Sequence, residues 1–340
     1  LNYIWCDLKK CIHIFLFFIV FPTILKAQYN QRNSFKNKRH EINFGLGISN
    51  CLTDVGGNGN RANFNFKKTN FTANFSHLYY IKNKIAFRTS LTHAKVSGDD
   101  SYSSDLFKKN RALNFITTIS EISGILEFTI ATSKNKNTYK SKNKRRKNIA
   151  NKARLSFGSY IFVGLGSFYY NPLGRNKFLD SDGNNIGDGQ IYSLRELHTE
   201  GQGFDGGPEQ FSEETTGEKY STYKNFAICF PIGFGIKKAF HSNGGIKLEA
   251  SYRFTNTDYL DDASSYYYDR EKLRTEMNQA FGVELAERAY IMSGTSTGSV
   301  MINSNSTNTE PGMNRGLANF NDSYIFLTFS IYKTINNTKL

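Results

Sequence analysis

Cysteine is scarce in this sequence of 340 residues, which contains four: Cys6, Cys11, Cys51 and Cys229. Cys6 and Cys11 lie, together with the single tryptophan, Trp5, in an N-terminal segment that we expect to be removed. The two remaining cysteines are too few for a disulfide framework, which excludes a small disulfide-stabilised domain. We interpret both as inert thiols.

The N-terminal segment, residues 1–27, has the pattern of a Sec signal peptide. Lys9 and Lys10 precede an apolar run over residues 11–25, which ends at Ala27 before Gln28. The run is shorter than the roughly 18 residues of a membrane anchor, and no cysteine stands at the cleavage point. We therefore predict an exported chain that is neither helix-anchored nor a lipoprotein.

A long apolar run is also missing from the rest of the chain, so no transmembrane helix is predicted there. Strict alternation is present instead, most clearly over residues 225–262. Apolar side chains occupy every second position from Phe226 to Ile236 and, after a turn at 241–245, from Ile246 to Phe254. This period of two predicts a hairpin whose strands, about 10 residues each, can cross a bilayer at a tilt. Alternation alone also fits a soluble sandwich, but export without helical spans, in a chain that is 15% aromatic, favours an outer-membrane barrel.

We therefore predict an all-β fold, an eight-stranded antiparallel transmembrane β-barrel with long extracellular loops. The barrel occupies residues 40–335, after a polar periplasmic lead-in (28–39) and before a C-terminal tail (336–340). The expected strands are 41–49, 71–80, 85–95, 116–130, 155–169, 226–236, 246–254 and 323–335. Short turns at 82–84 and 239–245 would be periplasmic. The loops 170–224 and 255–322 would be extracellular, and a hairpin hidden in either would raise the count to ten strands. The second loop also predicts a helix over 271–290.

Charged residues occupy inward positions of the predicted strands. A lumen of eight strands is too narrow for water flow, so we expect four acids and three bases to pair into a salt-bridge plug. Paired catalytic carboxylates are the alternative interpretation of the same set. The seven residues are Glu41, Arg88, Glu121, Glu127, Lys247, Glu249 and Arg253.

Two histidines fall on lipid-facing positions of neighbouring predicted strands, as a lipid-acting barrel enzyme would require. Pairing across the turn at Asn83 sets His93 opposite Ala73, which separates it from His77 by roughly 13 Å along the strand. That spacing argues against a catalytic dyad. We interpret both as interfacial residues and predict no enzymatic activity.

An acidic segment resembles a calcium loop, with oxygen ligands at alternating positions: Asp180, Asp182, Asn184 and Asp188. The bidentate Glu that such loops carry at the twelfth position is absent, because that region reads Ile191-Tyr192. A solvated acidic loop is favoured, and calcium remains a weak candidate. No other cofactor is predicted.

The connection between the fourth and fifth predicted strands is strongly basic and falls on the periplasmic side. It carries ten positive charges and no negative one, and its removal lowers the formal net charge from +14 to +4. Either a solvated turn or a docking element for a partner fits this composition. Nucleic acid is not expected in the periplasm, and only Tyr139 is interleaved as an aromatic stacking platform. The predicted partner-binding residues are Lys134, Lys136, Lys140, Lys142, Lys144, Arg145, Arg146, Lys147 and Lys152, and Arg154 is the tenth cation.

Several strings, in a fixed order along nearly the whole mature chain, resemble PorG-like outer-membrane proteins. They are HEINFGLGISN (40–50), VSGDD (96–100), YIFVGLG (160–166), LHTEGQG (197–203), FPIGFG (230–235), FTNTDYLDD (254–262) and NDSY (321–324). The resemblance implies a non-enzymatic barrel, surrounded by outer-membrane lipid, that is an accessory of the type IX secretion system linked to gliding motility. It also implies contact with a periplasmic ring built of a lipoprotein and a partner subunit. A structural or surface-binding barrel unrelated to secretion, or a lipid-acting barrel enzyme, is the alternative.

Overall fold

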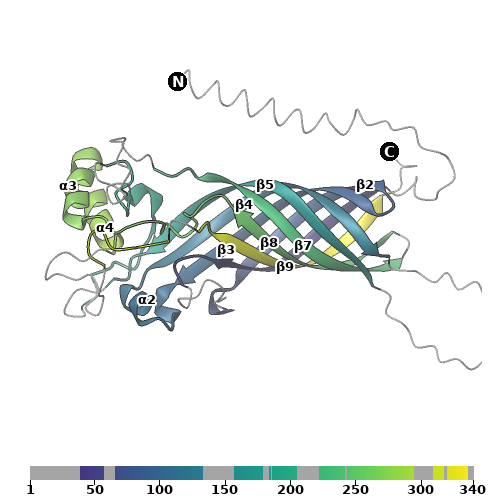
Figure 1. The fold of residues 1–340 in the computed structure, drawn as a ribbon, viewed down its shortest axis with the longest axis horizontal. Coiled ribbons are helices and arrows are strands. Elements are labelled where there is room, and N and C mark those ends of the chain that lie inside the picture. The colour runs from purple at the N-terminus through teal and green to yellow at the C-terminus, as the bar shows by residue number, and fades with distance from the viewer. Residues whose placement is uncertain are drawn as a thin grey trace, which may run out of the picture.

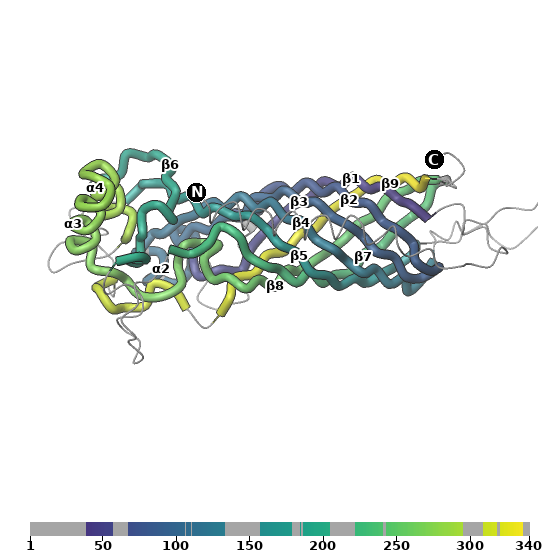
Figure 2. Tube along the Cα trace, turned by 90° about the horizontal axis from the view of Figure 1, so that it is seen from above, coloured from purple at the N-terminus to yellow at the C-terminus, as the bar shows by residue number. Residues whose placement is uncertain are grey.

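The computed structural model describes residues 39–56, 66–132, 157–178, 184, 186–204, 222–241, 243–294, 309–317 and 320–335. Its main feature is an antiparallel sheet that closes on itself (Figures 1 and 2). The strand order is β4-β3-β2-β1-β9-β8-β7-β5, and pairing of β4 with β5 completes the ring. The predicted eight-stranded barrel is therefore confirmed. The eight strands are β1 (His40–Leu52), β2 (Asn70–Lys82), β3 (Ile85–Asp99), β4 (Asn114–Ala131), β5 (Gly158–Arg175), β7 (Phe226–His241), β8 (Gly244–Thr255) and β9 (Ser323–Ile335).

Alternation along the strands separates an apolar exterior from a filled interior. Phe44 is 55% exposed, Phe234 62% and Ile331 64%, although all three lie in the middle of the sheet. Their chain neighbours point inward, and Asn43 and Ser330 are each 2% exposed. A one-residue shift of any strand would reverse this arrangement, so the hydrophobic pattern fixes the register.

The two ends of the barrel differ. At one end β2 and β3 are joined across residues 83–84, and β7 and β8 across 242–243. At the other end the connections carry the helices α2 (Leu106–Arg111), α3 (Arg270–Phe281) and α4 (Val283–Met292), the 3-10 turns η2 (Phe66–Lys68), η3 (Asp100–Tyr102) and η4 (Arg195–Leu197), and the short strand β6 (Ile191–Ser193). We call the described residues of the β1–β2, β3–β4, β5–β7 and β8–β9 connections the cap. Because short turns face the periplasm in outer-membrane barrels, the cap is extracellular.

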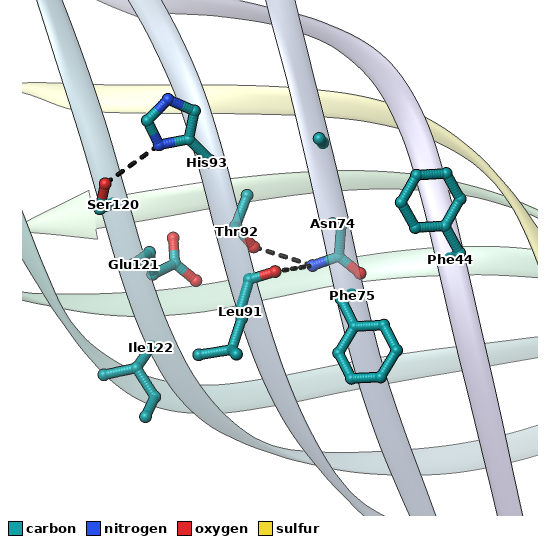
Figure 3. Close-up of a pocket in the computed structure, with 10 residues that line it drawn as sticks. Phe44, Asn74, Phe75, Leu91, Thr92, His93, Ser120, Glu121 and Ile122 are labelled. Carbon is teal, nitrogen blue, oxygen red and sulfur yellow. Dashed lines mark hydrogen bonds between the residues drawn. The ribbon is translucent and has the colours of Figure 1, made fainter.

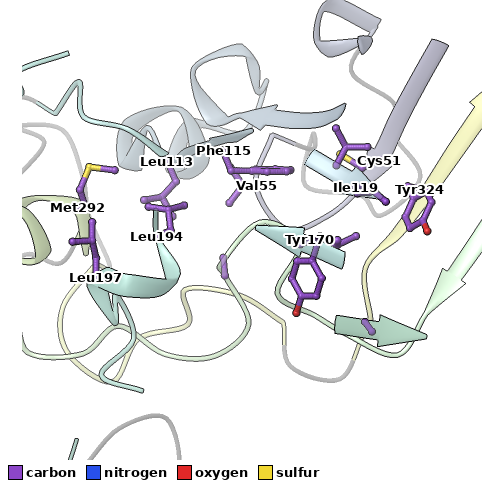
Figure 4. Close-up of a cluster of buried hydrophobic side chains, with 14 of the residues drawn as sticks. Cys51, Val55, Leu113, Phe115, Ile119, Tyr170, Leu194, Leu197, Met292 and Tyr324 are labelled. Atoms are coloured by element: carbon purple, nitrogen blue, oxygen red, sulfur yellow. The ribbon is translucent and has the colours of Figure 1, made fainter. Parts of the chain in front are cut away.

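The cap is a packed structure with its own apolar core. Leu194, Leu197 and Met292 bury against Leu113, and the core continues through Val55 toward the outer end of the lumen (Figure 4). The cap and the upper barrel thus share one hydrophobic cluster, which holds the loops in place.

Two predicted elements need correction. The predicted helix 271–290 is two helices, because Gly282 at their junction has φ +95, which ends α3. The strand predicted from residue 155 begins at Gly158 and extends to Arg175. In that extension Asn114 accepts a hydrogen bond from the Arg175 backbone N–H at 2.8 Å, so the β4–β5 hairpin rises into the cap. None of the helices in the described ranges is long and apolar enough to cross a membrane.

Candidate functional site: the sealed lumen and the cap

The structure places all seven of the predicted inward charges in the lumen, and none is more than 7% exposed. Toward the periplasmic end, Lys247 pairs with Glu41. Above them Arg88 lies 2.6 Å from Glu249 and 3.9 Å from Glu127 (Nη1 to carboxylate oxygen in both). Nearest the cap, Arg253 Nε lies 3.2 Å from the Oε2 of Glu121. Each cation thus meets a carboxylate from another strand, which ties the wall together across the lumen.

Tyrosines and a further lysine complete this network, and the sequence analysis missed them. Tyr80 donates to Glu41 at 2.8 Å, and Tyr324 donates to Glu121 at 3.0 Å. Lys237 donates to the Tyr80 hydroxyl at 3.0 Å. Their positions could have revealed the two tyrosines, because Tyr80 and Tyr324 fall on the inward-facing positions of the alternation in their strands. A buried carboxylate requires hydroxyl donors as well as cations, so the inward charges are only part of the network.

Aromatic rings fill the remaining space beside the guanidinium groups. The guanidinium of Arg88 lies 4.6 Å from the Phe162 ring, and that of Arg253 lies 4.3 Å from the Phe326 ring. A cavity between Arg88, Glu249 and Arg253 measures about 20 Å³, room for about one water molecule. At this level the lumen is sealed.

A second polar cluster lies in the cap, around Arg315. Its guanidinium lies 3.1 Å from Glu200 and 3.4 Å from Asp262. Glu200 also accepts hydrogen bonds from the backbone N–H groups of Ser264 and Ser265, at 2.9 and 3.2 Å. The strings LHTEGQG and FTNTDYLDD therefore meet here, which the sequence analysis did not foresee. Their acids join two connections of the cap, β5–β7 and β8–β9.

Asp262 illustrates how deeply this cluster is buried. It accepts a hydrogen bond from the Tyr223 hydroxyl at 2.6 Å and another from Thr199 at 2.5 Å. Burial raises the pKa of Asp262 to about 6, although Arg315 acts in the opposite direction. The arrangement therefore serves to fix the loops, because its polar groups form their hydrogen bonds and ion pairs with one another.

The two predicted interfacial histidines are separate in the structure. His93 pairs in register with Ala73, as predicted, and its Nδ1 lies 3.1 Å from the Ser120 Oγ. His77 instead contacts His40, with Nε2 and Nδ1 3.0 Å apart and rings stacked at 5.2 Å. The His40 contact was missed because it crosses to the other neighbouring strand.

His93 and Ser120 border a shallow groove of roughly 450 Å³ on the lipid-facing wall (Figure 3). Phe44, Phe75 and Ile122 supply its apolar lining. The groove is a lipid contact with one polar pair at its margin.

Several predicted residues lie outside the described residues. These are the basic set from Lys134 to Lys152, the acidic pair Asp180 and Asp182, and the segments 1–27, 28–38 and 336–340. Of the weak calcium candidate, Asp188 accepts hydrogen bonds from the Gln190 N–H at 2.9 Å and from Tyr192. Across the described ranges, no three His, Cys, Asp or Glu side chains are placed to hold a metal ion together.

The sheet is closed, its exterior is a belt of exposed apolar side chains and its interior is charged. That is the reverse of a water-soluble protein and the arrangement of a membrane barrel. The chain is an integral outer-membrane β-barrel protein.

Comparison with known proteins does not assign the chain to a particular family. No family model and no curated protein matches the chain. Among solved structures it is similar to Neisserial surface protein A (NspA), with a TM-score of 0.33 and 9% identity over 87% of this chain and 97% of that one. It is similar also to Ail, the attachment invasion locus protein of Yersinia pestis (TM-score 0.32, 9% identity, 87% and 99% coverage). For the outer membrane protein AlkL, solved in DMPC lipid bilayers, the TM-score is 0.28 and the identity 9%, over 93% and 99%.

Proposed function

We propose that this barrel is a non-enzymatic anchor of the type IX secretion machinery, and that it docks a periplasmic ring lipoprotein and its partner subunit through its periplasmic end. The position of the basic connection carries the proposal. β4 ends at Ala131 and β5 begins at Gly158, at the same end as the two-residue turns. The intervening segment, which carries ten positive charges, therefore connects the two strands on the periplasmic side. A barrel of this class normally has short connections there.

The sealed lumen favours a role as an anchor and argues against a role as a pore. Ion pairs between strands close the interior, and the cap covers the outer end, so the described residues leave no path for a solute. Function then falls to the surfaces outside the membrane. The charge of the periplasmic segment would attract an acidic partner surface and speed its association.

Deletion of residues 134–152 tests the proposal, with a variant of unchanged length in which the cations of that segment become Gln as the matched control for charge. We expect both variants to insert and fold, and both to lose the ring lipoprotein in pull-downs from detergent-solubilised membranes. Loss in the deletion alone would assign docking to the chain segment instead of its charge. Unchanged recovery of the ring in both would refute the docking role.

A surface-binding barrel is the second candidate, and one observation favours it. At the α3–α4 corner Phe281 is 56% and Val283 64% exposed, at the tip of an otherwise packed cap. A Phe281→Ser, Val283→Ser double variant separates the two functions. If the variant still recovers the ring lipoprotein in pull-downs, but cells that carry it no longer attach to surfaces, the cap is the functional surface.

A further inference from the structure

Four aspartates from three separate segments gather beneath the cap. Asp54 follows β1, Asp258 and Asp261 follow β8, and Asp322 precedes β9. They are close enough for each charge to affect the ionisation of the others. Asp258 is 7% exposed, Asp261 2% and Asp322 3%. The cluster therefore gathers four carboxyl groups in a place that water scarcely reaches.

Three of these carboxylates hold the loops together through backbone hydrogen bonds. Asp261 accepts from the Val55 N–H at 2.8 Å. Asp322 accepts from the Leu260 N–H at 2.8 Å, and Asp54 accepts from the Leu317 N–H at 2.6 Å. The cluster thus joins the β1–β2 connection to the two ends of the β8–β9 connection.

Asp258 differs from the other three. Neither of its carboxylate oxygens accepts a hydrogen bond of normal geometry from the residues that the structure describes. A buried ionised carboxylate without donors is strongly unfavourable, whereas a neutral carboxyl is tolerated and can itself donate a hydrogen bond. The geometry favours the protonated form.

The cations around the cluster do not balance it. Arg111 Nε lies 2.5 Å from Asp100 Oδ2 and is paired there. Lys108 donates to the Asp54 backbone carbonyl at 2.7 Å. The titratable and charged groups that face the four aspartates are Cys51 of β1, Asp100 of η3, Lys108 and Arg111 of α2, Tyr170 of β5, and Glu200 after η4.

We propose that Asp258 carries a proton while the cap is closed, and that loss of this proton loosens the cap, so the cluster is a pH-sensitive latch on the outer face of the barrel. Burial and the carboxylates of Asp261 and Asp54 raise the pKa of Asp258 to about 9, and the Ser264 side chain acts in the opposite direction. Burial, with Asp54, also raises the pKa of Asp261 to about 7.

The sign of the effect follows from linkage. In the opened cap Asp258 would be solvated and would titrate near its ordinary value of about 4. From there up to about pH 9, opening releases a proton, so the equilibrium constant for opening rises by up to about tenfold per pH unit. The latch is fully closed at acid pH and is lost as the pH rises through the raised pKa values. An ordinary ion-paired aspartate has the opposite dependence.

Hydrogen exchange of the full mature protein in lipid nanodiscs tests the latch. Segments 53–56 and 259–264 report the cap, and β7 (226–236) reports the barrel in the same sample. After correction for intrinsic exchange, we expect protection of the cap segments to fall by about tenfold or more per two pH units between about pH 6 and pH 9, while β7 stays protected. The nearly isosteric Asp258→Asn should flatten this dependence above about pH 7. Asp188→Asn, which changes an exposed aspartate away from the cluster, should leave the profile unchanged.

Two outcomes would overturn the proposal. A cap whose protection is independent of pH in the natural protein would show that no proton is held. Protection that is restored at alkaline pH by millimolar calcium and removed by EDTA would show that a cation, and not a proton, neutralises the cluster. The natural-protein profile decides the question even if Asp258→Asn fails to fold, which loss of β7 protection would reveal.

Discussion

At the scale of single residues, the lumen shows what a charged interior requires. Glu41 receives the ammonium of Lys247 and the hydroxyl of Tyr80, so its two oxygens are engaged by different strands. Lys247 is 1% exposed, and its Nζ lies 5.4 Å from the rings of both Tyr160 and Tyr332. Each charge depends on its partner, because neither can reach water.

Removing one partner should therefore cost more than removing both. We expect Lys247→Met to lower the free energy of unfolding by about 3–5 kcal/mol, because it leaves Glu41 buried without its cation. The double variant Lys247→Met, Glu41→Gln should recover much of that loss, since no uncompensated charge remains. Urea titration in lipid vesicles, followed by the mobility of unboiled protein on gels, measures both.

Lys333→Met is the control, because Lys333 lies on the exposed face of β9. It should change stability by no more than about 0.5 kcal/mol. A single variant no less stable than the double variant would show that the lumen pair is dispensable.

Seven of the inward charges were predicted from the sequence, because alternation decides which side chains face the lumen. Lys237 follows the same alternation in β7 and was missed. Which acid meets which base could not be predicted from the sequence. Arg88 and Glu249 are 161 positions apart and meet at 2.6 Å only because β3 and β8 face each other across the closed lumen. Pairing of this kind depends on barrel closure, which no local pattern encodes.

At the scale of elements, strands were easier to predict than the cap. From Ile325 to Ile331 the alternation of β9 is unbroken, and its predicted bounds are those observed. The cap instead depends on tertiary contacts, such as Leu194 and Leu197 packing on Met292. The single helix predicted in the cap is two helices in the structure. The break could have been predicted locally, because Gly282 stands between two helical runs.

Gly282 offers a test of that junction. Its φ of +95 and ψ of 167 lie in a region that is essentially restricted to glycine. A Cβ added there meets nothing within 4 Å, so the effect of Gly282→Ala would be backbone strain alone. We expect it to destabilise the α3–α4 pair locally by about 1–3 kcal/mol, measured by hydrogen exchange over residues 270–292.

The matched control is Gln279→Ala, on the exposed side of α3. It should leave the protection of both helices within about 0.5 kcal/mol of the natural protein. If Gly282→Ala behaves like this control, the corner does not require glycine, and the break between the helices has another origin.

At the scale of the whole molecule, the two proposed functions fall at opposite ends of the barrel. The wall faces lipid and the lumen is filled, so neither is available to a water-soluble partner. The cap is one candidate surface, and the periplasmic end, where the basic segment leaves β4 and enters β5, is the other. This division depends on a single physical claim, that the exposed apolar belt lies in hydrocarbon.

A tryptophan probe tests that claim directly, because the chain from Gln28 onward contains none. Phe329, midway along β9, is 50% exposed, and Phe281, in the cap, is 56% exposed. In a water-soluble protein these two sites would be equivalent. In a membrane barrel, Phe329→Trp lies in the acyl chains and Phe281→Trp lies outside the bilayer.

We therefore expect lipids brominated on their acyl chains to quench the fluorescence of Phe329→Trp strongly and to leave Phe281→Trp unaffected, whereas aqueous acrylamide should quench the second and spare the first. The paired design removes exposure as an explanation, because the two side chains are almost equally uncovered by protein. Equal acrylamide quenching at both sites, with no effect of bromination, would mean that water surrounds the belt. The division of function between the two ends would then have no basis, since the whole exterior would be open to partners.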